Sequence, residues 1–168
     1  MMEDVQVSYR VMDFGPLVLL GKKTIVQQGK TATKFVKSFR TDGSNAYLQS
    51  LDERVSPMGD VIIWMGEYDG VQETFVEIPG VFVKPGTQTP EGFAARELPA
   101  CTMAVCTLSG RTRSLSRGAH NKLVKLMAAD GYAPDYSYGY SMEYYSYENY
   151  EKDNELYQFS YYLPCKKK

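Results

Sequence analysis

The chain has 168 residues, a length that favours one domain with a single substantial core. Its 19 basic and 20 acidic residues leave a formal charge of −1, which does not favour binding to nucleic acid or to an anionic membrane. The longest apolar runs, residues 17–20 and 61–65, are too short to cross a bilayer, and the first residues lack the features of a signal peptide. We therefore expect a cytoplasmic protein with one domain over residues 1–168.

The first elements of the chain are two strands and a helix. Apolar residues alternate with mostly polar ones over residues 5–11, and residues 17–26 predict a second, more buried strand. Apolar residues then recur at helical spacing from Ala32 to Phe39, which predicts a helix, and residues 46–51 add a further helical turn.

A hairpin and a linker follow. Strands are expected over residues 60–69 and 74–83, with a tight turn at Asp69, Gly70 and Val71. Residues 85–90 contain two prolines and a glycine, which favour neither a strand nor a helix, so they predict a linker between two halves.

The second half repeats this order of elements. Residues 92–98 and 101–108 predict strands, residues 114–129 a helix, and residues 136–147 and 155–163 two further strands. The chain is therefore expected to contain two repeats, residues 1–84 and 91–168.

This pattern predicts an α+β fold built from duplicated β-α-β-β units. Such units are expected to form a mostly antiparallel, curved sheet with two main helices on one face. Pockets form preferentially where such halves meet, which predicts a ligand groove between them.

Metal and thiol chemistry have little support. Cys101, Cys106 and Cys165 lack metal-ligand spacing and are interpreted as reduced structural thiols. The single histidine, His120, has no local partner for a metal site and is expected to be a surface or capping residue of its helix. No metal and no cofactor is predicted.

Aromatic residues are concentrated near the C-terminus. Eleven of the 14 tyrosines lie in the last 37 residues, and the segment 142–147 sets Glu143 among Met142, Tyr144, Tyr145 and Tyr147. A carboxylate beside aromatic rings can hold a cation, because ring faces attract positive charge and the acid supplies the counter-charge. The same carboxylate, kept partly dry, can act as a general acid or base.

Several short motifs, in this order and spacing, carry a family resemblance. They are Ile78-Pro79-Gly80-Val81, Pro90-Glu91-Gly92-Phe93, Leu98-Pro99-Ala100, Thr107-Leu108-Ser109-Gly110, Asp130-Gly131-Tyr132, Met142-Glu143-Tyr144-Tyr145 and Tyr161-Tyr162-Leu163-Pro164. With them the chain resembles the GyrI-like small-molecule-binding domains, which include effector-binding domains of AraC-type and MerR-type bacterial regulators. Strand-like sequence begins by Val5, which leaves no room for a helix-turn-helix segment and predicts a stand-alone member that does not bind nucleic acid directly.

The resemblance implies a cleft lined by aromatic side chains around an acidic residue. The family's glutamate, in a phenylalanine-Glu-x-Tyr pattern, falls on Glu143, with Tyr145 at the tyrosine position and Met142 in place of phenylalanine. Some members bind lipophilic cations, and some are implicated in hydrolysing strained cyclopropane electrophiles with that glutamate. A tyrosine common in the first repeat is replaced here by Glu77.

Strand parity selects further candidate residues. Side chains at i and i+2 share a face, so Glu143, Tyr145 and Tyr147 are predicted to point one way, with Tyr136, Tyr138, Tyr140 and Tyr144 pointing the other. Glu67 is interpreted as the first-half counterpart of Glu143, on the face opposite to Trp64 and Tyr68. The remaining candidates for ligand binding are Trp64, Glu77, Phe82, Phe159 and Tyr161.

Two functions from different classes follow. In the first, the protein senses or sequesters hydrophobic molecules, either cationic or planar aromatic, which stack between rings and pair with Glu143. In the second, it is a hydrolase in which Glu143 acts as the general acid or base and Tyr145 positions the electrophile. A protein-binding role like gyrase inhibition rests on fold analogy alone.

Overall fold

A computed structural model describes residues 5–110, 115–147 and 157–168. The chain forms two compact units. We call residues Gly15–Pro99 the central unit, and the chain before Gly15 and after Pro99 the terminal unit. Both units combine helices with strands that pair antiparallel, which confirms the predicted α+β class. No helix in the described part of the chain is long and apolar enough to cross a membrane.

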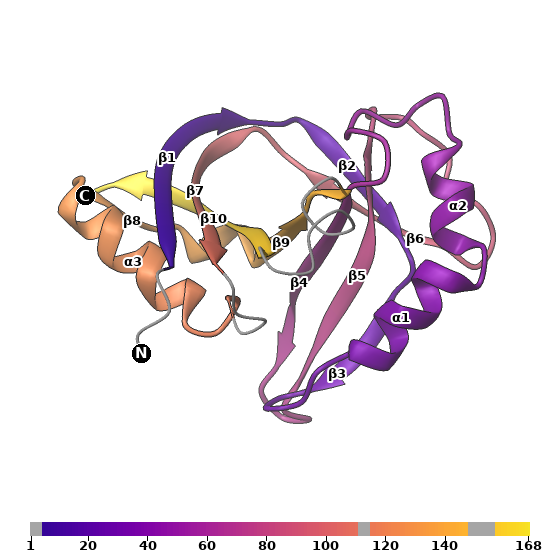
Figure 1. The fold of residues 1–168 in the computed structure, drawn as a ribbon, viewed down its shortest axis with the longest axis horizontal. Helices are drawn as coiled ribbons and strands as arrows, with labels where there is room; N and C mark the ends of the chain where they lie inside the picture. The colour runs from indigo at the N-terminus through magenta and orange to yellow at the C-terminus, as the bar shows by residue number, and fades with distance from the viewer. Residues whose placement is uncertain (1–4, 111–114, 148–156) are drawn as a thin grey trace. The chain divides into compact units, whose positions relative to one another are not determined.

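The central unit contains five strands and two helices (Figure 1). Its elements are β2 (Leu17–Gly21), β3 (Thr24–Gln27), α1 (Thr33–Thr41), α2 (Ser44–Gln49), β4 (Val61–Asp69), β5 (Thr74–Val83) and β6 (Ala94–Leu98). The strand order is β4-β5-β2-β6, and β3 continues along the same edge of β5 as β2. Leu19, Leu48, Ile62 and Ile78 are completely buried and form its core.

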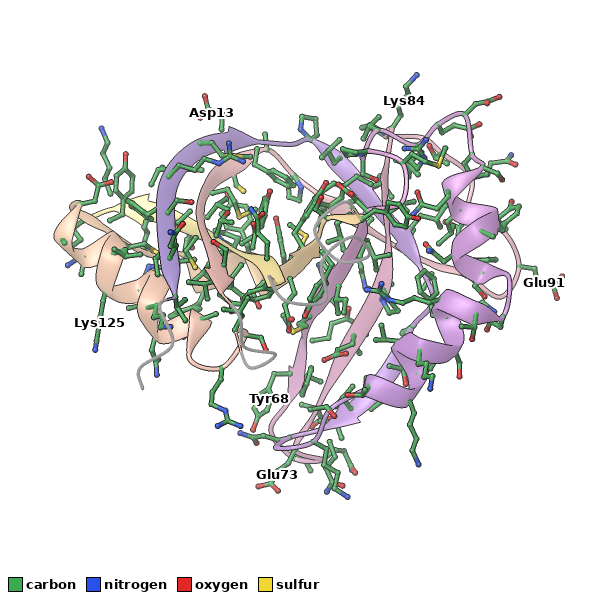
Figure 2. The ribbon with its side chains drawn as sticks, in the orientation of Figure 1. Asp13, Tyr68, Glu73, Lys84, Glu91 and Lys125 are labelled. Atoms are coloured by element: carbon green, nitrogen blue, oxygen red, sulfur yellow. The ribbon has the colours of Figure 1, made fainter. Side chains whose placement is uncertain are left out.

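The predicted hairpin of the central unit is confirmed. Strands β4 and β5 pair antiparallel, and the Asp69 carboxylate accepts hydrogen bonds from the N–H groups of Val71 and Gln72, which closes the turn. Figure 2 shows the side chains of Tyr68 and Glu73 at this tip.

The strand predicted over residues 17–26 is interrupted at Lys22 and Lys23. The N–H of Lys22 donates to the carbonyl of Pro79 at 3.1 Å, but proline has no N–H to return a bond. The ladder therefore loses one bond at this pair and resumes in the same register, with Thr24 opposite Glu77. Pro79 on the partner strand β5 therefore explains why the predicted strand is divided into β2 and β3.

In its described residues, the terminal unit contains four main strands, a short strand and one α-helix (Figure 1). Its elements are β1 (Gln6–Phe14), β7 (Cys101–Gly110), α3 (Ala119–Ala129), β8 (Tyr132–Pro134), a 3-10 turn η1 (Tyr136–Tyr138), β9 (Tyr140–Tyr145) and β10 (Tyr157–Lys167). The strand order is β1-β7-β10-β9, and β8 pairs with the end of β10. The first strand of the chain thus pairs with a strand of its second half.

Helix α3 packs through a stripe of buried residues, Ala119, Leu123 and Met127. It begins at Ala119, later than predicted, because Gly118 lies in the left-handed region with φ 73°. Residues 111–114 and 155–156, which include the predicted starts of this helix and of the last strand, lie outside the described residues.

The strand predicted over residues 136–147 is shorter than expected. Tyr136–Tyr138 form a 3-10 turn, in which the Asp135 side chain accepts a hydrogen bond from the N–H of Ser137. Gly139 ends the turn in the left-handed region, with φ 74°. The hydrogen bond to Asp135 and the left-handed conformation that glycine permits at Gly139 therefore outweigh the strand propensity of the tyrosines.

Candidate functional site

The candidate site lies in the terminal unit, on one face of strands β9 and β10. The antiparallel register sets Glu143 directly opposite Tyr161. Tyr145 shares the face of Glu143 because it lies two residues further along the same strand, and Phe159 shares the face of Tyr161 for the same reason. The ring centroids of Tyr145 and Phe159 are 5.6 Å apart. The fold thus gathers four predicted residues, which we call the Glu143 cluster.

Glu143 is a partly buried carboxylate whose partner is a phenol. The hydroxyl of Tyr145 donates a hydrogen bond to Glu143 Oε2. Burial raises the pKa of Glu143 above its ordinary value, and the hydrogen bond from Tyr145 opposes part of that shift. Among the residues that the structure describes, no Lys, Arg or His forms an ion pair with this carboxylate. Within the described part of the chain, the Tyr145 hydroxyl is therefore the group that stabilises its negative charge.

The aromatic members of the cluster are well packed. Phe159 is 4% exposed and Tyr161 is 8% exposed. Burial is the main cause of the raised pKa of the Tyr161 hydroxyl, and the nearby charge of Glu143 adds to it. The Tyr161 hydroxyl therefore stays protonated, and the rings of Phe159 and Tyr161 are largely shielded from water beside the carboxylate.

The other face of β9 is structural. Met142 is completely buried, and the rings of Tyr144 and Tyr162 stack with centroids 5.6 Å apart. Tyr162 also meets Phe14 edge to face at 6.1 Å. The predicted separation of Tyr144 from Glu143 is therefore correct. The same prediction is wrong for Tyr136 and Tyr138, which lie in the 3-10 turn and not in the strand.

His120 was expected at the surface, but it is partly buried against the cluster. Its Nδ1 lies 3.1 Å from the hydroxyl of Tyr161, and its Nε2 lies 3.4 Å from the hydroxyl of Tyr136. The histidine ring stacks on Tyr136 with centroids 6.4 Å apart. The sequence carries a signal for this position, because His120 precedes Leu123 by three residues and Met127 by seven, which is the spacing of one helix face.

Two further candidates, Trp64 and Glu67, meet in the central unit. Glu67 forms a two-pronged ion pair with Arg96, with Oε2 2.6 Å from Nε and Oε1 3.1 Å from Nη2. The same guanidinium lies 5.5 Å from the centroid of the buried Trp64 ring. Arg96 thus supplies a cation to this carboxylate and ring, which distinguishes Glu67 from Glu143.

The predicted separation of Glu67 and Trp64 onto opposite faces is wrong. The pairing of β4 with β5 shifts register between Gly66 and Asp69, and Glu67 has φ 54°. A bulge of this kind reverses the alternation of side chains, so Glu67 and Trp64 both reach Arg96.

The remaining candidates are Tyr147, Glu77 and Phe82, which differ in burial. Tyr147 follows the end of β9 and is 49% exposed. Glu77 is partly buried on β5, opposite Thr24 of β3. Phe82 is buried at 6% exposure, and its N–H donates to Ser56 Oγ at 3.3 Å, which makes it a core residue of the central unit.

Metal ligation has no support in the described part of the chain, which holds no group of three or more His, Cys, Asp or Glu side chains suited to a metal ion. The three cysteines are free thiols. Burial raises the pKa of Cys106 and of Cys165 to about 11, so both stay protonated near neutral pH.

Comparison with known proteins gives a fold but no sequence family. The chain matches no protein-family model and no curated protein sequence. Among solved structures, it is similar to SAV2435 bound to tetraphenylphosphonium, with a TM-score of 0.69 and 14% identity, covering 95% of this chain and 94% of that one. A putative bacterial transcription regulation protein from Staphylococcus aureus MU50 is similar with a TM-score of 0.65 and 16% identity, covering 95% of this chain and 98% of that one.

Two structures of EcmrR are further matches. The EcmrR C-terminal domain has a TM-score of 0.60 and 17% identity, with complete coverage of both chains. For EcmrR in a DNA complex the TM-score is 0.62 at 16% identity. This match covers 98% of the present chain but 58% of the EcmrR chain. The predicted resemblance is therefore confirmed in the fold, which this chain shares with the EcmrR C-terminal domain and with SAV2435.

Proposed function

We propose that the protein binds hydrophobic cations at the Glu143 cluster, for sensing or sequestration. The observation that carries this proposal is a partly buried carboxylate without an ion-pair partner among the described residues, on one face with Tyr145, Phe159 and Tyr161. The fold shared with SAV2435, whose structure contains tetraphenylphosphonium, supports the same ligand class.

The physical reason is charge compensation in a partly dry site. Burying a carboxylate costs free energy unless a positive charge or several hydrogen bonds compensate it. A lipophilic cation supplies that charge and carries little hydration of its own, so it loses little on leaving water. The ring of Tyr145, which is partly exposed, adds cation–π attraction and apolar contact, and the packed rings of Phe159 and Tyr161 keep the carboxylate partly dry. Tyr147 at the end of β9 is a further candidate contact.

The pH dependence of binding tests this proposal. A bound cation stabilises the ionised carboxylate, so it lowers the pKa of Glu143 from the raised value of the free protein. Binding then releases a proton, and affinity for tetraphenylphosphonium falls as the pH drops through the pKa of the free protein, by up to about tenfold per pH unit. Calorimetric titration in buffers of different ionisation enthalpy measures both the affinity and the proton release.

Triphenylphosphine oxide, which is neutral, is the matched ligand for this experiment. Its affinity should stay constant over the same pH range, because it gains nothing from an ionised Glu143. A parallel decline of both affinities would remove charge pairing from the proposal, and absence of saturable binding by either compound would remove the proposal itself.

A hydrolase is the second candidate, and the raised pKa of Glu143 favours it. A carboxyl group whose pKa is raised by burial can act as a general acid or base, and the Tyr145 hydroxyl bonded to it can orient an electrophile. In this mechanism Glu143 takes a proton from water as the water attacks a cyclopropane carbon, and then returns the proton to the carbon released by ring opening.

The hydrolase candidate predicts a product one water heavier than the substrate. Mass spectrometry after incubation with cyclopropane-containing electrophiles should detect it for the unchanged protein, and Glu143→Gln should lower the rate by at least about a hundredfold. If every compound is recovered unchanged and binding is saturable, the hydrolase candidate is rejected and the binding function remains. A cytoplasmic location and the absence of direct DNA binding stay predictions from the sequence.

A further inference from the structure

The central unit contains a strongly basic stretch, residues 22–40, which is distant in sequence from the Glu143 cluster. Between Lys22 and Arg40 the chain carries six basic residues and no acidic residue, although the whole chain has a formal charge of −1. Strand β3 lies within this stretch and most of helix α1 does, and Figure 1 shows α1 beginning next to β3. Three of these basic residues, Lys34, Lys37 and Arg40, lie on α1, and the other three flank β3, which carries no charge itself.

A hollow of about 610 Å³ lies in this basic stretch. It is lined by residues 24–27 of β3 and by residues 30–35 at the start of α1. We call this hollow the β3 groove. Lys30 and Lys34 line it, and so does Ile25, whose side chain is 67% exposed. The groove thus offers both charge and an apolar contact.

Strand β3 also has a free hydrogen-bonding edge. The N–H of Gln28 donates to the carbonyl of Glu73, so even-numbered residues of β3 form the hydrogen-bonded pairs with β5. Since these pairs alternate in an antiparallel ladder, the backbone groups of Ile25 and the N–H of Gln27 point to the opposite edge. Strand β6 pairs with β2 as far as Gly21 and does not continue along β3.

We propose that the β3 groove binds an extended segment of an acidic protein partner. The segment adds as a strand to the free edge of β3, sets apolar side chains against Ile25, and points carboxylates at Lys30 and Lys34. Strand addition to an exposed sheet edge supplies affinity through main-chain hydrogen bonds, and side-chain charge supplies selectivity.

Two other occupants fit these features less well. A second copy of the chain, pairing β3 with β3, would set each copy's lysines against the same lysines of the other, and like charges repel. Duplex DNA would use the lysines but neither the exposed Ile25 nor the strand edge, because phosphate contacts need no apolar groove. Charge and edge together therefore favour an acidic peptide.

The test uses the full chain and a short acetylated peptide in which glutamate and valine alternate. We expect saturable binding with a dissociation constant of about 10–100 μM. Amide resonances of Ile25 and Gln27 should shift by NMR. The peptide methylated on alternate backbone nitrogens should not bind, because it cannot complete the ladder.

Two double variants are compared, each reversing two lysine charges, one pair in the β3 groove and the other pair in the terminal unit. Lys30→Glu together with Lys34→Glu should weaken binding of the glutamate peptide about tenfold or more, whereas Lys125→Glu together with Lys167→Glu should leave it unchanged. Lys125 projects from α3 in the terminal unit, as Figure 2 shows.

Four outcomes would overturn the inference. They are the absence of binding up to about 1 mM peptide, equal binding of a lysine–valine peptide, equal loss in both double variants, and shifts that avoid Ile25 and Gln27. Duplex DNA bound at these lysines would assign the surface to nucleic acid instead. Concentration-dependent dimers with the same amide shifts would assign it to a second copy.

Discussion

Substituting Glu143 by Gln should weaken binding of tetraphenylphosphonium by about thirtyfold, which corresponds to about 2 kcal/mol. The amide keeps the size of the carboxyl group and can still accept a hydrogen bond from Tyr145, but it carries no charge. The lost free energy is therefore the attraction between the ligand cation and the carboxylate, strengthened because the site is partly buried. Calorimetry at a pH above the raised pKa of Glu143 measures the full difference.

Two controls make this result specific. Glu97→Gln removes an equivalent charge from an exposed position on β6 and should leave the affinity unchanged, since exposed charges are screened by water and salt. The neutral triphenylphosphine oxide should bind the unchanged protein and Glu143→Gln within about a factor of two of each other. Equal losses for the cation and the neutral compound would mean that the substitution disturbed the site and did not merely remove its charge.

Substituting Gly80 by Ala should lower the free energy of unfolding by about 3 kcal/mol. Gly80 on β5 pairs directly with Gly21 on β2, and the two backbones approach closely. A Cβ on Gly80 would lie 2.1 Å from the carbonyl oxygen of Leu20, and one on Gly21 would lie 2.0 Å from that of Pro79. Both contacts are with backbone, which cannot rotate away, so the strands must separate.

Gly70 provides the matched control for this stability measurement. It lies in the turn between β4 and β5, and a Cβ there would meet its nearest atom, on the Tyr68 ring, at 3.7 Å. Gly70→Ala should therefore change the free energy of unfolding by no more than about 0.5 kcal/mol. Urea unfolding followed by the fluorescence of Trp64, the single tryptophan, reports on the central unit that holds both glycines. Equal midpoints for the two variants would contradict the steric argument.

Much of the fold was predictable because local patterns are strong. Two strand-like segments joined by a tight turn predicted β4 and β5 within one residue, and helical spacing predicted α1. Errors arose where one residue overrides a pattern. Pro79 interrupts the partner of residues 17–26, and Gly139 with Asp135 turns tyrosines with high strand propensity into a 3-10 turn.

The candidate site was predictable in part. Parity along a strand correctly grouped Glu143 with Tyr145, since residues two apart share a face. The bulge at Glu67 was not predictable, because it depends on how β4 matches β5, and the sequence holds no glycine at that position to indicate a left-handed backbone. His120 had a helical-spacing signal, but its partner Tyr161 lies 41 residues further along the chain.

The sequence by itself determined the α+β class and the order of elements, and it selected Glu143 with its neighbouring tyrosine. These depend on the period of apolar residues and on residue identity, which are local properties. Only the tertiary structure decided which carboxylates are compensated. Glu67 forms an ion pair with Arg96 because a bulge on β4 turns it toward β6. Glu143 lies opposite Tyr161 on β10 and forms no ion pair with a described residue. Compensation of charge depends on strand register, and register is fixed by contacts between distant segments.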